Sequence, residues 1–195
     1  MAQETPESIS SRATGALFFA AGGSVWLCAG LALTLHLPLA IALVAILLLT
    51  LVLPAVRILR RTSRAPHAAA NSERDRGVQR AFNWINTIQW LLAGAAVTLL
   101  NVNHQQVFIA PAIAFIVGAH LLPLARLFRY AAHYVTGSLL VLWALGLMVW
   151  IPRDDLPRVC SLGAAAILLT SAAYTLTLSW HAANRLRKFE PSALN

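Results

Sequence analysis

One long apolar run, residues 109–129, constrains what this chain can fold into. It reads IAPAIAFIVGAHLLPLARLFR and carries no acidic or basic charge before Arg126. A helix needs about 20 predominantly apolar residues to cross the ~30 Å hydrocarbon core of a bilayer. An apolar run that ends in a proline and two arginines is typical of a helix that crosses a membrane and reaches its positively charged side.

Five further segments have the same character. Of the 195 residues, 58% are hydrophobic and 11% are charged, whereas roughly 25% are charged in a typical soluble domain. The sequence therefore predicts an all-α, polytopic membrane protein, a single domain of six transmembrane helices arranged as three hairpins. The expected spans are about 14–35, 38–59, 78–101, 107–128, 134–151 and 158–180, with a cytosolic loop at 60–77 and a cytosolic tail at 181–195.

The basic residues fall almost entirely on one side of these spans. Of the 15 Lys and Arg residues, only Arg153 and Arg158 fall on the other side. Cytoplasmic loops of membrane proteins carry an excess of Lys and Arg, so we expect a protein of the bacterial inner membrane with both termini in the cytoplasm. The positive charge then contacts lipid headgroups. No segment outside the spans combines basic with stacking aromatic residues, so no nucleic-acid partner is expected.

The expected spans contain no Asp or Glu. Proton-coupled pumps usually rely on an intramembrane carboxylate, and metal transporters on clustered carboxylate, His or Cys ligands. A membrane hydrolase needs a nucleophile, a base and an orienting acid, and one histidine deep in a span is too few for haem. We therefore expect no catalytic residue, no metal, no cofactor and no enzymatic activity. Cys28 and Cys160 lie at different depths and are expected to be free.

Polar side chains recur in the cytosolic half of the spans. His120 lies about two turns from the end of its span, and Pro123 removes a backbone donor just after it, which predicts a kink. Helical spacing places further polar groups at a similar depth on other spans. The candidate ligand-binding residues are His120, Asn86, Gln89, Tyr174, Thr136 and Arg126.

Two interpretations of this polar layer remain open. In one, the side chains hydrogen-bond between helices and hold the bundle together, each contributing about 0.6 kcal/mol. In the other, they line a cytosol-facing pocket for a small neutral or anionic molecule. The first functional hypothesis is accordingly a non-enzymatic protein that binds or transports such a molecule, and transport would require a homo-oligomer. The alternative is a structural or partner membrane subunit with no ligand of its own.

Two pairs of arginines occur in the same L-P-x-x-R-x-x-R pattern. Arg57 and Arg60 follow Pro54, and Arg126 and Arg129 follow Pro123. Each pair is spaced i, i+3 and shares one helix face. Such arginines reach lipid phosphates without any further function, and an anion-binding clamp is the alternative. Both segments end helices that run in the same direction, so a parallel repeat and chance similarity are both open.

Two segments carry a resemblance to known proteins. They read IAPAIAFIVGAHLLPLARLF from Ile109 and HYVTGSLL from His133. In these segments the chain resembles a group of small bacterial integral membrane proteins with six predicted spans and no established activity. The layout of three hairpins is also similar to that of the HdeD-like membrane proteins, although no motif is shared. The first resemblance implies that His120, Pro123 and Arg126 matter and implies no reaction.

Overall fold

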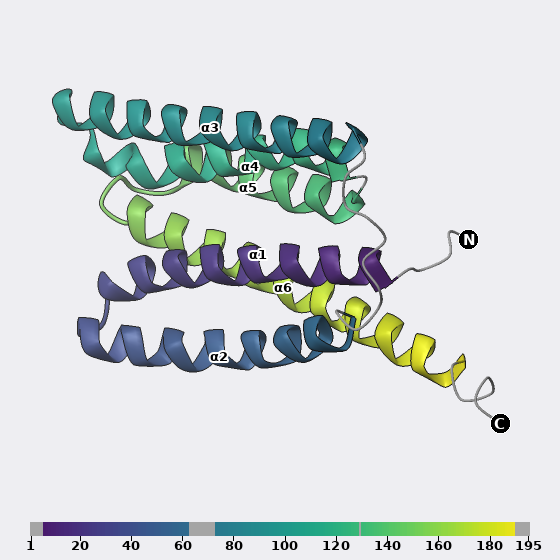
Figure 1. Ribbon diagram of the computed structural model, residues 1–195. Coiled ribbons are helices and arrows are strands. Elements are labelled where there is room, and N and C mark those ends of the chain that lie inside the picture. The colour runs from purple at the N-terminus through teal and green to yellow at the C-terminus, as the bar shows by residue number, and fades with distance from the viewer. Residues whose placement is uncertain (1–5, 63–72, 129, 190–195) are drawn as a thin grey trace.

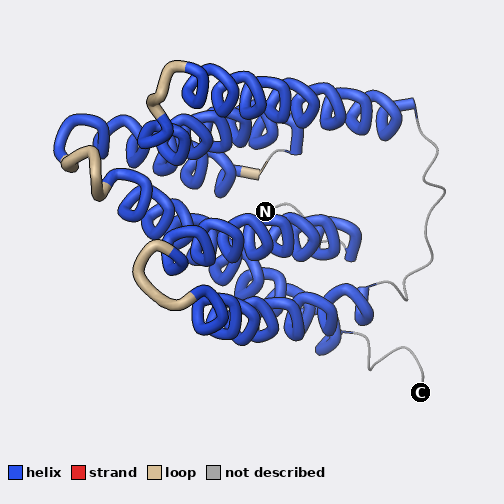
Figure 2. Tube along the Cα trace, turned by 90° about the vertical axis from the view of Figure 1, so that its left-hand side faces the viewer, coloured by secondary structure: helices blue, strands red, loops and turns tan. Residues whose placement is uncertain are grey.

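Six α-helices account for nearly all of the residues that the structure describes, which are 6–62, 73–128 and 130–189 of a computed structural model (Figure 1). Figure 2 shows in tan the short loops that join consecutive helices among the described residues. Each helix is long and apolar enough to cross a membrane, so the predicted class, all-α with six spans, is confirmed. The helices are α1 (Pro6–Ala32), α2 (Leu37–Thr62), α3 (Glu73–Val102), α4 (Ile109–Phe128), α5 (Ala131–Trp150) and α6 (Leu156–Phe189), with a 3-10 helix at Gln106–Phe108.

Several helices run on beyond the predicted spans into polar sequence. Helix α1 begins at Pro6 instead of residue 14, and α6 ends at Phe189 instead of residue 180. Helices α2 and α3 likewise occupy both ends of the predicted loop 60–77. The length of an apolar run indicates where hydrocarbon begins, but a helix can continue into water because its backbone bonds stay within the segment. Residues 63–72 of the loop and 190–195 of the tail lie outside the described residues.

The helices pack as two groups of three. Helices α1, α2 and α6 form one group, and α3, α4 and α5 form the other. Helix α6 contacts both α4 and α5 and so joins the groups, while among the described residues α3 contacts only α4 and the 3-10 helix. Figure 1 shows α3 at the edge of the bundle. Consecutive helices alternate in direction, as hairpins require, but the most extensive interface joins α1 to α6, which belong to different hairpins.

The two ends of the bundle differ in charge. Arg12, near the start of α1, lies at the same end of the bundle as the arginines that close α2 and α4 and those that open α3. We call this the basic end. At the opposite end Arg153 lies 5.5 Å from the centre of the Phe108 ring, and Arg158 forms a 2.7 Å ion pair with Asp155. The charge at that end is therefore balanced locally.

Helices α4 and α5 approach each other closely where they cross at Gly118 and Gly137. A Cβ atom on either glycine would lie 2.7 Å from the carbonyl oxygen of the other, well inside van der Waals contact. The two backbones therefore touch, with no side chain between them. Close approach of this kind increases the dispersion contacts between the helices. In lipid these contacts drive helix association, since burying apolar surface gives no hydrophobic gain there.

Glycines also set the contact between α1 and α6. A Cβ at Gly23 would lie 2.8 Å from Cγ of Leu169, and one at Gly30 would lie 2.7 Å from Cδ2 of Leu162. The small residues of the first span thus serve the close packing that the sequence led us to expect. On α6, Gly163 lies directly beneath the Trp143 ring, which connects α5 to α6.

The Gly118 crossing can be tested by adding one methyl group. We expect Gly118→Ala to lower the free energy of unfolding by about 1–3 kcal/mol, the usual cost of overpacking, because backbone on α5 cannot move aside as a side-chain end can. The matched control is Gly22→Ala, where the nearest atom would be 3.9 Å away. Unfolding by SDS in mixed micelles, followed by tryptophan fluorescence, measures both. Equal stability of the two variants would contradict the close crossing.

Candidate functional site

Polar side chains at the basic end connect helices to one another. Oγ1 of Thr136 on α5 and Oγ of Ser171 on α6 are 2.8 Å apart and share a hydrogen bond. The Tyr130 hydroxyl, just before α5, is 3.0 Å from Oγ1 of Thr175 on α6. Thr136 and Thr175 are both almost completely buried. Two polar contacts therefore hold α5 against α6 at this end.

A buried histidine, His133 on α5, lies at the centre of this region. Its ring meets three aromatic rings edge to face: Phe19 at 5.1 Å, Tyr130 at 5.1 Å and Phe128 at 6.5 Å between centroids. These rings come from α1, the start of α5 and the end of α4. His133 therefore contacts side chains from both groups of helices.

Two histidine nitrogens in this region are buried without a hydrogen-bond partner. They are Nδ1 of His133 on α5 and Nε2 of His120 on α4. With a proton on Nδ1, His120 donates to the carbonyl oxygen of Val117 in its own helix at 3.3 Å, which leaves Nε2 as an acceptor. A buried polar atom with no partner costs about 1–3 kcal/mol, and a bound polar molecule could supply the missing partner.

The six predicted ligand-binding residues are spread over four helices. Thr136 is buried and His120 half-buried, and both lie in the interior of the basic end. Asn86 and Gln89 are half-buried on α3, whereas Tyr174 on α6 is 58% exposed. Because α3 makes no contact with α6 in the described chain, Asn86 and Gln89 are not brought together with Tyr174. Arg126 is exposed at the end of α4.

The predicted headgroup-binding arginines lie near helix ends in the part of the chain that the structure describes. Arg57 and Arg60 are exposed near the end of α2, as Arg126 is near the end of α4. Pro54 and Pro123 lie inside these helices, which continue past them to Thr62 and Phe128. Arg129 lies outside the described residues.

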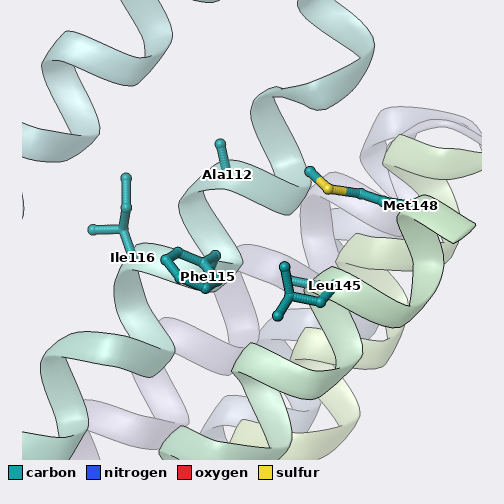
Figure 3. Close-up of a pocket in the computed structure, with 6 residues that line it drawn as sticks. Ala112, Phe115, Ile116, Leu145 and Met148 are labelled. Atoms are coloured by element: carbon teal, nitrogen blue, oxygen red, sulfur yellow. The ribbon is translucent and has the colours of Figure 1, made fainter.

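A hollow of about 300 Å³ lies between α4 and α5, toward the end opposite the basic end. Figure 3 shows side chains from both helices around it, among them Phe115 and Met148. All of its lining residues are apolar: Ala112, Phe115, Ile116, Ala144, Leu145 and Met148. Phe115, Leu145 and Met148 are also exposed on the surface of the bundle. In a membrane, such a hollow faces lipid chains and offers nothing to hold a polar molecule.

Sequence reasoning missed His133, which the expected spans placed in the basic turn before residue 134. Helix α5 instead begins at Ala131, so His133 lies in the first turn of the helix and its side chain is buried. The sequence did contain one indication that His133 matters, because the second segment that carries the family resemblance starts at this residue. Cys28 and Cys160 are free thiols, and no cluster of three or more His, Cys, Asp or Glu that could hold a metal occurs among the described residues.

Comparison with known proteins places the chain in a family. No curated protein and no solved structure matches it, so the similarity of its layout to the HdeD-like proteins stays a prediction. A family match, in contrast, extends over residues 3–178, from before the first helix to within the last. Because the match covers most of the sequence, this six-helix membrane protein belongs to DUF7010, a family of unknown function.

Proposed function

We propose that the protein is a non-enzymatic partner subunit of the bacterial inner membrane, which docks another membrane protein through α3. The observation that carries this proposal is a mismatch between polarity and exposure. Helix α3 has the lowest mean hydropathy and the least burial of the six, with 6% of its membrane window buried against 17% to 44% for the others.

A helix that faces lipid on most sides should be strongly apolar, because hydrocarbon offers no hydrogen bonds to polar side chains. Helix α2 follows this rule, since it is the next most exposed helix and has the highest mean hydropathy of the six. Helix α3 does not follow it. A partner protein that covered the exposed side of α3 would shield its polar side chains from lipid.

The polar layer at the basic end supports a structural role for the interior. Thr136 and Ser171 bond to each other, as do Tyr130 and Thr175, so these groups are satisfied within the bundle. Tyr174, which a ligand pocket would need, is mostly exposed. A structural role of this kind requires no catalytic residue.

The inner-membrane orientation that we propose places the basic end in the cytoplasm. The excess of arginine at that end supports it, and both the start of α1 and the end of α6 lie there (Figure 1). A fluorescent-protein fusion to the carboxyl terminus is expected to be bright, and an alkaline-phosphatase fusion at the same place inactive. The reverse pattern would contradict the orientation.

The docking role is tested by photocrosslinking in native membranes. A photoreactive residue at Leu91, on the outer face of α3 and 67% exposed, is expected to capture protein. The same residue at Ile46 on α2, 63% exposed, is the matched control and should capture only lipid. Capture of lipid alone at both positions would overturn the docking role.

A small neutral or anionic ligand at the polar layer is the second candidate, favoured by the unpartnered nitrogens of His120 and His133. His133→Phe distinguishes the two roles. If no molecule is bound there, phenylalanine removes an unsatisfied buried nitrogen, which costs about 1–3 kcal/mol, and the Tm in detergent is unchanged or rises. A marked fall in Tm would favour the ligand. Tyr130→Phe, which loses the bond to Thr175, is the control that should lower the Tm in either case.

A further inference from the structure

Helix α3 has two faces of different character. The face toward α4 carries half-buried residues at helical spacing, Val78, Phe82, Ile85, Gln89, Ala93, Ala96 and Leu100. On an ideal helix with 3.6 residues per turn, a second row lies on the opposite side. Its members are all exposed: Asn83, Thr87, Trp90, Leu91, Gly94, Thr98 and Asn101. We call this row the outer face of α3.

The outer face combines small, amide and hydroxyl-bearing side chains. Gly94 and Thr98 are one turn apart, and a Cβ at Gly94 would have no neighbour within 4 Å. Two small residues spaced i, i+4 allow another helix to approach closely in a membrane. Trp90 and Leu91, 73% and 67% exposed, flank this notch and could pack on either side of an approaching helix.

The polar groups of the outer face are only partly satisfied within the chain. Asn83 accepts a 3.0 Å hydrogen bond from Gln79 through its carbonyl oxygen, which leaves its NH₂ group free. Asn101 donates to the carbonyl oxygen of Val97 at 2.8 Å, which leaves its own carbonyl oxygen free. An amide oxygen accepts two hydrogen bonds and an amide NH₂ group donates two, so each asparagine still offers both a donor and an acceptor to a copy of itself.

These groups match a second copy of the same surface. Two copies inserted in the same orientation and related by a two-fold axis along the membrane normal bring each residue of α3 opposite its own counterpart. Amides and hydroxyls both donate and accept, so each can pair with itself. No charged side chain lies between Arg80 and Asn101, so no like charges meet within the membrane. Arg76 and Arg80 lie at the basic end, where water and salt screen their repulsion.

We propose that the protein forms a parallel homodimer in which the outer faces of two α3 helices cross at Gly94. This inference rests on the docking role proposed above and names the partner as a second copy of this chain. Asn83 pairs with its counterpart near the basic end, as a single buried asparagine does when it fixes the register of two parallel helices.

The dimer is tested in lipid vesicles with the full chain. Subunit counting by single-molecule photobleaching is expected to find two copies of the wild type together at low density. Gly94→Leu fills the notch without touching the rest of its own bundle, and we expect it to weaken the dimer about tenfold or more, which corresponds to roughly 1.4 kcal/mol. The matched control is Ala45→Leu on the exposed side of α2, which should leave dimerisation unchanged.

The outcomes separate this inference from the docking role. Monomeric wild type, or a dimer that Gly94→Leu leaves intact, overturns the α3 homodimer. If the photoreactive residue at Leu91 then captures a different membrane protein, the docking role stands and only its partner is changed. If it captures lipid alone, both proposals fail. Capture of a second copy of the chain would support both proposals.

Discussion

Hydrocarbon offers the backbone no hydrogen bonds, and the whole architecture follows from that constraint. Every spanning segment has to satisfy its own N–H and C=O groups, which leaves the helix as the solution for an apolar chain of this length. Lipid also removes the hydrophobic reason for helices to associate, so contact depends on how closely backbones approach. Glycines on α1, α4 and α5 allow such close approach, and they lie in the α1–α6 and α4–α5 interfaces.

The class and the number of spans could be predicted from the sequence because both depend on local apolar length. Helix pairing could not, since the α1–α6 interface joins segments from opposite ends of the chain. Gly23 and Gly30 indicated that span 1 packs closely but not against which partner. The end of an apolar run also says little about the end of a helix, and for that reason α5 begins early enough to bury His133.

The candidate site was predicted only in part, for a related reason. Depth along a helix can be counted from sequence, and His120 and Thr136 lie at the basic end at the depth that such counting gives. Rotation about the helix axis and the choice of neighbours depend on packing. Tyr174 therefore faces outward although its depth is suitable, and Asn86 and Gln89 lie on a helix that never meets α6. Membership of the family agrees with the resemblance carried by α4 and α5, and it brings no reaction with it.

The mutual contact of Gly118 and Gly137 has a mechanical consequence. Because each backbone fills the space that a Cβ on the other would need, neither helix can rotate or slide without a collision. This contact therefore restricts movement of α4 relative to α5. Helix α3 is held less firmly, because among the described residues it packs only against α4 and the 3-10 helix.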